Sequence, residues 1–193
     1  MSKYVVIALI GKAGSGKDTI MRGVVKDAPF IHEIVSFTTR PPREGEINGV
    51  NYFYLSHDEF AQKVLRGEML EATSFNDWFY GTSYDSLCSG KINIGVFNPA
   101  GIEALLHNKD ILLLPFYVVA SDKNRLIRQL DREENPDVYE IMRRFKADDI
   151  DFEDVEEDFP FEETLHNDNL KDLEDNINMI LSVVNGLYGI HLD

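Results

Sequence analysis

A glycine-rich segment near the N-terminus has the residue types and the spacing of a phosphate-binding loop. Three glycines fall within residues 11–16, and Lys17 follows them directly. Glycines let the backbone curl so that successive N–H groups point inward, and a lysine supplies a mobile positive charge for the β- and γ-phosphates. A turn that only joined a strand to a helix would need neither feature. The segment predicts a nucleoside triphosphate site formed by Gly11, Lys12, Ala13, Gly14, Ser15, Gly16, Lys17, Asp18 and Thr19.

The residue after this lysine departs from the usual pattern. Ser or Thr is normal there because its hydroxyl binds Mg²⁺, whereas this chain has Asp18. One hypothesis is that the Asp18 carboxylate binds Mg²⁺ directly or through a water molecule, as a hard oxygen ligand. The alternative is that Asp18 caps the first helical turn or pairs with an arginine, which leaves Thr19 or water for the metal. Both hypotheses stay open at this point.

A second set of phosphate-binding groups follows the loop in the sequence. Arg40 and Arg43 stand three residues apart in segment 38–49, which holds two prolines and two glycines and is expected to be an extended loop. Two guanidinium groups, together with the hydroxyls of Tyr52 and Tyr80, can clamp the oxygens of one phosphate monoester. The spacing therefore indicates a second, smaller phosphorylated ligand.

Glu71 is suited to reading the base of such a ligand. Its carboxylate matches the N1–H and N2–H₂ donors of guanine, whereas adenine presents an acceptor at N1 and would face the carboxylate with a lone pair. The hydroxyls of Ser36 and Thr82 can serve the guanine O6. These residue types favour guanine over adenine.

The chain resembles the guanylate kinase family over nearly its whole length. The resemblance is carried by the phosphate loop, by Ser36-x-Thr38-Thr39-Arg40-x-x-Arg43-x-Gly45-Glu46-x-Asn48-Gly49-x-x-Tyr52, by Glu71 in G-E-x-L-E and by Tyr80-Gly81-Thr82-Ser83. It implies phosphoryl transfer from ATP to GMP or dGMP with Mg²⁺, giving GDP or dGDP. It also implies a substrate site made of Ser36, Arg40, Arg43, Tyr52, Glu71, Tyr80, Gly81, Thr82 and Asn98.

The same resemblance assigns a lid to the later arginines. Arg128 and Arg132 lie one helical turn apart, and Arg143 and Arg144 follow them. Lid arginines of the family close over ATP and stabilise the charge of the transferring group, although an arginine in an acidic protein often makes only surface ion pairs. The resemblance implies Lys17, Arg40, Arg132 and Arg143 as catalytic residues, with Arg143 chosen narrowly over Arg144. It adds Arg128 and Asn167 to the ATP site and sets Asn167-Asp168 against adenine.

Two features depart from the family. Its members usually carry Asp-x-Asp at the end of a core strand where this chain has Val96 and Asn98, and the segment between Tyr84 and Gly90 is a few residues shorter. These changes concern the arrangement of the metal more than the fold.

The expected architecture is a single α/β domain, large enough at 193 residues to bury a core. It is a P-loop NTPase three-layer sandwich with a parallel core sheet, an inserted mixed α+β monophosphate-binding subdomain and a helical lid. The core comprises residues 1–37, 83–120 and 164–193, the insert about 38–82, and the lid with its flanking helices about 121–163.

Hydrophobic patterning predicts the individual elements. The strand of residues 5–10 should be central because it is apolar throughout. Further strands are expected at 34–37, 50–55, 68–74, 78–82, 92–97, 111–120 and 164–167. Helices are expected after the phosphate loop and from a Ser56/Glu59 capping box to Gly67, the second with an apolar face of Phe60, Ala61, Val64 and Leu65. Two more are expected after a Ser121/Asp122 cap, with a face of Leu126, Ile127 and Leu130, and from Pro136. A last helix is expected from Asn169, with a packing face of Leu170, Leu173, Ile177, Ile180, Leu181 and Val184.

The charge composition of the chain limits the kinds of molecule that it is expected to bind. Nineteen basic and 34 acidic residues give a formal charge of −15, which should repel nucleic acid and phospholipid surfaces. The acidic run at 148–163 is expected to be a solvated helix and loop. One cysteine, Cys88, excludes an intramolecular disulfide framework, and the apolar run at 4–10 is too short for a signal peptide or membrane span. We expect a cytoplasmic monomer or homodimer that binds GMP or dGMP and ATP.

Two other functions remain as alternatives. One is a kinase for another nucleoside or deoxynucleoside monophosphate, which the changed strand end slightly favours. The other is a non-catalytic guanylate-kinase-like module that recognises peptides. Such modules typically lose the phosphate loop, whereas this chain keeps Gly11, Gly16 and Lys17.

Overall fold

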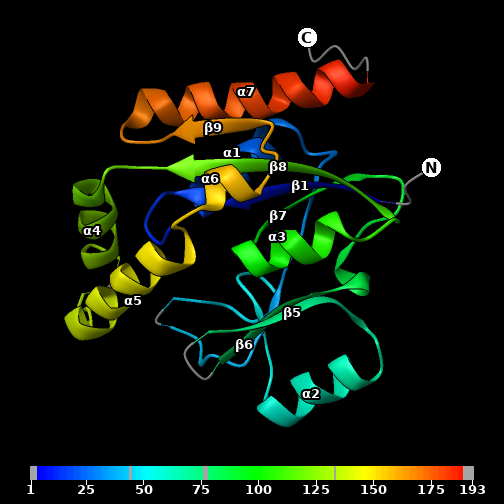
Figure 1. Ribbon diagram of the computed structural model, residues 1–193, viewed down its shortest axis with the longest axis horizontal. Coiled ribbons are helices and arrows are strands. Elements are labelled where there is room, and N and C mark those ends of the chain that lie inside the picture. Colours follow the sequence, from blue (N-terminus) through cyan, green and yellow to red (C-terminus); the bar gives the residue numbers. More distant parts are fainter. Residues whose placement is uncertain (1–3, 44, 76–77, 133, 189–193) are drawn as a thin grey trace. The chain divides into compact units, whose positions relative to one another are not determined.

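The structure is a computed structural model that describes residues 4–43, 45–75, 78–132 and 134–188. Two compact units make up the chain. The first comprises Met1–Ala8 and His32–Leu114, and the second comprises Leu9–Ile31 and Pro115–Asp193. Figure 1 shows the helices and strands of both.

The core sheet has the strand order β2-β7-β1-β8-β9. Its strands are β1 (Tyr4–Ile10), β2 (His32–Glu33), β7 (Ile92–Val96), β8 (Ile111–Val119) and β9 (Glu163–His166). The pairs β2–β7 and β8–β9 are parallel, and β1 is buried along nearly its whole length. The central position of β1 and the parallel core sheet flanked by helices confirm the predicted α/β P-loop fold.

The first unit also contains a mixed sheet of order β4-β3-β6-β5. It comprises β3 (Phe37–Thr38), β4 (Phe53–Tyr54), β5 (Met69–Phe75) and β6 (Trp78–Ser83). Strand β3 runs parallel to β4 and antiparallel to β6, and Figure 1 shows β5 and β6 as neighbouring ribbons. The remaining elements of the unit are α2 (His57–Leu65), the 3₁₀ helix η1 (Tyr84–Ser86) and α3 (Pro99–Leu106).

Two strand predictions for this unit were wrong in extent. Of the expected strand at 34–37 only Phe37 lies in a strand, because the chain leaves the core sheet at Glu33, the end of β2, and enters the mixed sheet at Phe37, the start of β3. The expected strand at 50–55 is only β4. Its first residues form a turn instead, in which the N–H groups of Val50 and Asn51 donate to the carbonyl of Ile47.

Helix α2 confirms one prediction and corrects another. Ser56 and Glu59 form the predicted reciprocal capping box, and Gly67 just beyond the helix has a φ of 67°. The predicted apolar face is wrong, because Phe60 alone of its four members is buried and Ala61, Val64 and Leu65 are exposed. Two rings of α2 contact Phe79 instead: buried Phe60 stacks on it and His57 meets it edge to face, both at a centroid distance of 5.5 Å.

The second unit contains α1 (Lys17–Asp27), α4 (Asp122–Leu130), α5 (Val138–Asp151), α6 (Val155–Asp158) and α7 (Leu170–Tyr188). Helices α1 and α7 pack together, and Gly23 of α1 gives Ile177 of α7 its space, since a Cβ at that position would overlap the isoleucine side chain. Ile177, Ile180 and Val184 of α7 are buried as predicted, whereas Leu170 is exposed because it lies in the first turn.

Two expectations for α4 were wrong. The buried residue of α4 is Arg125, whereas Ile127 and Leu130 are exposed, because this helix turns its polar side toward the phosphate loop. Ser121 occupies the N-cap of α4 but makes no capping hydrogen bond, since its hydroxyl donates to Asp168 instead.

Helix α5 starts two residues after Pro136, behind an Asp137 cap. The run at 148–163 is not wholly solvated, because its first residue, Asp148, is buried.

Candidate active site

The phosphate loop has the curled backbone that the sequence predicted. Gly14 and Gly16 have φ values of 79° and 99°, in the left-handed region that favours glycine. A side chain at Gly14 would also bring its Cβ within 2.5 Å of the carbonyl oxygen of Arg125. A Cβ at Gly11 would overlap the carbonyl oxygen of Val118. The glycines therefore supply both the turn and the room for close packing on β8 and α4.

Lys17 folds back into this loop. Its Nζ donates to the carbonyl oxygens of Gly11 at 2.6 Å and Lys12 at 3.0 Å. Burial lowers the pKa of Lys17, and the nearby positive charges of Arg125 and Arg132 lower it further, while Asp18 and Asp148 oppose the shift. The ammonium group thus lies within reach of two arginine charges, as a site for a polyanion requires.

Arg128 and Asn167, both predicted for the ATP site, lie against the loop. The Arg128 guanidinium donates to the carbonyl oxygens of Gly14 at 3.2 Å and of Asn167 at 2.8 Å. The Asn167 amide donates to the carbonyl oxygen of Ser15 at 2.8 Å. These hydrogen bonds hold α4 and the end of β9 against the loop.

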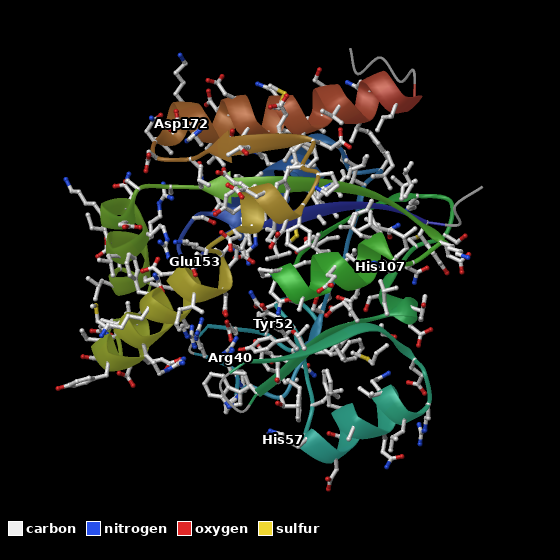
Figure 2. All side chains as sticks on the ribbon, in the orientation of Figure 1. Arg40, Tyr52, His57, His107, Glu153 and Asp172 are labelled. Atoms are coloured by element: carbon white, nitrogen blue, oxygen red, sulfur yellow. The ribbon has the colours of Figure 1, made fainter. Side chains whose placement is uncertain are left out.

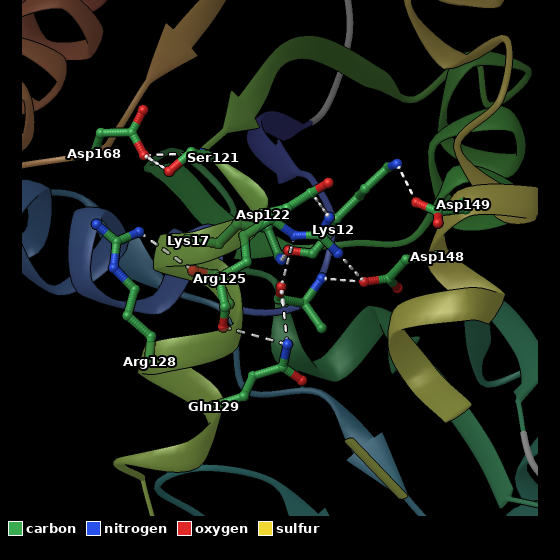
Figure 3. A network of polar contacts seen from close by, with 12 residues as sticks. Lys12, Lys17, Ser121, Asp122, Arg125, Arg128, Gln129, Asp148, Asp149 and Asp168 are labelled. Atoms are coloured by element: carbon green, nitrogen blue, oxygen red, sulfur yellow. Dashed lines mark hydrogen bonds and ion pairs between the residues drawn. The ribbon is translucent and has the colours of Figure 1, made fainter. Parts of the chain in front are cut away.

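Asp168, the neighbour of Asn167, holds the start of α4. It accepts hydrogen bonds from the Ser121 N–H, the Ser121 hydroxyl and the Asn124 amide, all between 2.8 and 2.9 Å. These bonds lower the pKa of the Asp168 carboxyl. Its role in the structure is to join the end of β9 to α4 (Figure 3).

The three other arginines predicted for the lid differ in their surroundings. Arg132 is exposed just after α4. Arg143 and Arg144 both pair with Glu140 on α5, at 2.8 and 2.7 Å. The structure therefore brings the charge of Arg132 toward Lys17 and gives Arg143 and Arg144 a shared partner on their own helix.

Sequence reasoning missed two residues at the loop. Arg125 and Asp148 are buried beside Ala13 and bonded to each other at 2.8 Å (Figure 3). Removal from water raises the pKa of the Asp148 carboxyl, and the Ala13 N–H, Lys17 and Arg125 oppose that shift. One feature of the sequence could have indicated this pair: Arg125 lies within a short helix that was predicted to be amphipathic.

The predicted monophosphate clamp lies in the first unit. Arg40 is buried, and its guanidinium carbon lies 5.7 Å from the centroid of the Tyr52 ring; Figure 2 labels both residues. The rings of Tyr52 and Tyr80 meet edge to face at 6.2 Å, and burial raises the pKa of Tyr80. Arg40, Tyr52 and Tyr80 are therefore brought together as predicted, with half-buried Arg43 on the same loop.

Glu46 is the residue that fixes this clamp, and sequence reasoning gave it no role. Its carboxylate accepts from the Arg40 guanidinium at 2.8 and 3.0 Å, from the Arg43 N–H at 2.8 Å and from the Tyr54 hydroxyl at 2.8 Å. Burial and the hydrogen bond to Glu46 raise the pKa of Tyr54 to about 12. The position of Glu46 between Arg43 and Tyr52 in the family motif was the sequence feature that could have indicated this role.

The predicted base-reading residues also converge. Glu71 on β5 faces Thr82 on β6 in the strand register, and the hydroxyls of Thr82 and Ser36 lie 3.2 Å apart. Glu71 is 9% exposed, and burial raises its pKa to about 7 against the hydrogen bonds from Thr82. Gly81 allows this packing, since a Cβ there would lie 2.6 Å from the carbonyl oxygen of Glu71.

Asn98 has local partners at both ends of its amide. Its oxygen accepts from the Gly101 N–H at 2.8 Å and so caps α3, and its nitrogen donates to the Thr73 hydroxyl at 2.7 Å. The side chain borders the base-reading residues, because a Cβ at Gly101 would lie 3.6 Å from a carboxylate oxygen of Glu71.

The chain is similar to known guanylate kinases in sequence and in fold. The family model described as guanylate kinase matches residues 2–183. A curated guanylate kinase from a Nostoc species is 31% identical over 165 residues, 80% of this chain and 83% of the relative. One from Campylobacter jejuni is 26% identical over 183 residues, 91% and 87% of the two chains. A solved guanylate kinase from Anaplasma phagocytophilum superposes with a TM-score of 0.68 at 18% identity, covering 96% of this chain and 87% of that one.

Proposed function

Because the chain belongs to the guanylate kinase family, we propose that it transfers the γ-phosphoryl group of ATP to GMP, giving ADP and GDP. The observation that carries the proposal is the buried carboxylate of Glu71 next to the hydroxyls of Thr82 and Ser36, with a clamp of Arg40, Tyr52 and Tyr80 in the same unit. A purine with donors at N1 and N2 and one phosphate monoester satisfies both groups.

The chemistry requires positioning and charge stabilisation more than a covalent step. The N–H groups of the phosphate loop and the Lys17 ammonium hold the β- and γ-phosphates of ATP. Arg40 and Arg43 hold the phosphate of GMP, whose oxygen attacks the γ-phosphorus in line. Arg132 and Arg143 stabilise the charge that spreads over the transferring group. Exclusion of water by the lid keeps hydrolysis from competing.

Guanine recognition should depend on pH, because Glu71 must be ionised to accept both guanine donors. The pKa of Glu71 is about 7, so the ionised fraction falls as the pH drops below 7. We expect the KM for GMP to rise about tenfold between pH 8 and pH 6 while the KM for ATP changes little.

Initial rates at saturating concentrations of the second substrate measure this effect. The control is Glu71→Gln, whose remaining pH response reports the titration of the GMP phosphate alone. The same response in the wild type and in the variant would contradict a titrating Glu71.

We also propose that the reaction uses Mg²⁺, shared between the protein and the phosphates. The described residues contain no group of three His, Cys, Asp or Glu side chains that could hold a metal by themselves. Asp18 is exposed on the first turn of α1, close enough to Lys17 to raise its pKa, and a single carboxylate suits an ion that keeps phosphate and water ligands. The ion would offset charge on the triphosphate, and Thr19 offers a second oxygen.

Two variants of Asp18 separate metal binding from helix capping. If Asp18 contacts Mg²⁺, we expect Asp18→Asn to need about tenfold more Mg²⁺ for half-maximal kcat, while Asp18→Ser recovers much of the activity through its hydroxyl. The measurement is kcat against free Mg²⁺ at saturating nucleotides. A single Mg²⁺ midpoint for wild type and both variants would indicate a cap.

The predicted architecture around the site remains part of the proposal. We infer an insert at about 38–82 that binds the monophosphate, a lid at about 121–163 and a core made of the rest. In the described residues no helix has the length and apolarity to cross a membrane. We propose a cytoplasmic monomer or homodimer in purine nucleotide metabolism, and the formal charge of −15 supports the proposal that it binds neither nucleic acid nor membrane surfaces.

ADP release with a panel of acceptors tests the proposal. With ATP and Mg²⁺, we expect turnover with GMP and dGMP and little with AMP, CMP or dTMP. Turnover that favours dTMP or another base would point to a different monophosphate kinase. Nucleotide binding without turnover on any acceptor would point to a binding module.

A further inference from the structure

One peptide unit of the phosphate loop is held from both sides. Its N–H, that of Ala13, donates to the carboxylate of Asp148 at 2.7 Å. Its carbonyl, that of Lys12, accepts from the Nζ of Lys17 at 3.0 Å and from the Ser15 N–H at 3.2 Å. Because the two groups belong to one planar peptide, a carboxylate that fixes the N–H also fixes the direction of the carbonyl that holds Lys17.

Asp148 is itself held by Arg125. The guanidinium of Arg125 donates to Asp148 at 2.8 Å and, through Nε, to the carbonyl oxygen of Ala13 at 3.1 Å. It also donates to Asp122 at 2.8 Å and lies 4.4 Å from the centroid of the Phe145 ring. Figure 3 shows this network on one side of the loop. Both the N–H and the carbonyl of Ala13 are thus bound by one ion pair.

Burial of the Arg125–Asp148 ion pair costs free energy of folding, so its presence calls for a reason other than stability. Arg125 is 1% exposed and Asp148 is 8% exposed. A buried ion pair often stabilises a fold no better than apolar side chains of the same volume, because both charges lose their hydration. Stability therefore does not account for the pair. Three hydrogen bonds, one within the pair and two to Ala13, instead hold the peptide whose carbonyl binds Lys17.

We propose that Arg125 and Asp148 are positioning residues for phosphoryl transfer. Through the peptide between Lys12 and Ala13 they hold the Lys17 ammonium where the β- and γ-phosphates of ATP bind. Neither side chain needs to touch a substrate. The turnover readouts rest on the proposed function, but the effect on ATP binding does not.

Replacements of Asp148 test the proposal by comparing the two substrates. We expect Asp148→Ala to raise the dissociation constant and the KM for ATP about tenfold, because the charge-assisted hydrogen bond from the Ala13 N–H to the carboxylate is lost. The KM for GMP should stay unchanged. Asp148→Asn should lose only about threefold in ATP affinity, since its amide oxygen can still accept from the Ala13 N–H. Titration calorimetry with ATP and steady-state kinetics supply these values.

Asp151→Asn is the matched control, since it removes one charge from an exposed position on the same helix and should leave ATP affinity unchanged. Thermal unfolding sets an assay temperature at which every variant is folded. If Asp148→Ala does not fold, the comparison of Asp148→Asn with Asp151→Asn decides.

ATP affinity equal to that of the control, or equal losses for ATP and GMP, would overturn the proposal. A wild-type protein that binds ATP but phosphorylates no monophosphate would refute the proposed function and leave the binding series valid.

Discussion

Replacement of Arg132 by alanine is expected to lower kcat about 1,000-fold while changing the KM for GMP little. Burial is the main cause of the lowered pKa of Lys17, and the charge of Arg132 contributes to it, so we expect the two cations to act on the same bound phosphates. A guanidinium in that region meets the transferring phosphoryl group, whose charge spreads over its three equatorial oxygens in the transition state. An exposed arginine that only made a surface ion pair would contribute at most about 1 kcal/mol of stability and nothing to the rate.

Arg22→Ala provides the matched control for this experiment. Arg22 is an exposed arginine on α1 of the same unit, so its loss changes the net charge equally. Single-turnover rates with both substrates bound separate chemistry from product release. A kcat of Arg132→Ala close to that of Arg22→Ala would mean that Arg132 has no part in the transition state.

Replacement of Glu71 by glutamine is expected to raise the KM for GMP about 100-fold and to leave the KM for ATP unchanged. Glu71 is almost fully buried opposite Thr82. The amide nitrogen of glutamine is a donor, so one of the two guanine donors would face another donor at a buried position. The change is nearly isosteric, which keeps the β5–β6 packing and limits the loss of stability.

Glu68→Gln is the corresponding control, because Glu68 lies three residues earlier and pairs with Lys63 at 2.9 Å on the surface. It should bind GMP like the wild type. Initial-rate measurements with GMP, and with inosine monophosphate, which lacks the 2-amino group, show which donor is lost. An unchanged KM for GMP in Glu71→Gln would remove Glu71 from the base site.

Much of this structure follows from local sequence signals. The phosphate loop was predictable because glycines and a lysine at this spacing have few other uses, and β1 because an unbroken apolar run suits a strand covered on both faces. The capping box of Ser56 and Glu59 was predictable because it depends on residues only three positions apart. Glu71, Thr82 and Ser36 were expected together from their hydrogen-bonding chemistry and from the family resemblance, and the β5–β6 register explains how Glu71 and Thr82 meet.

The features that could not be predicted depend on distant partners. Periodicity placed the buried face of α4 on Leu126, Ile127 and Leu130, but the loop beside that helix offers unpaired backbone groups, so Arg125 is buried instead. The partner of Arg125, Asp148, is 23 residues away in an acidic run that appeared solvated. Pairings of this kind have no sequence period and become visible only when the helices are placed.

Transfer of the labelled γ-phosphoryl group of ATP tests the central claim most directly. After incubation with γ-³²P-ATP, Mg²⁺ and GMP and separation of the nucleotides, we expect the label in GDP. When GMP is omitted, we expect no label in inorganic phosphate. Lys17→Met, which removes the ammonium group from the loop, should abolish the transfer. Label that remains in ATP in the presence of GMP, or that appears as inorganic phosphate whether or not GMP is present, would contradict the assignment of this protein as a guanylate kinase.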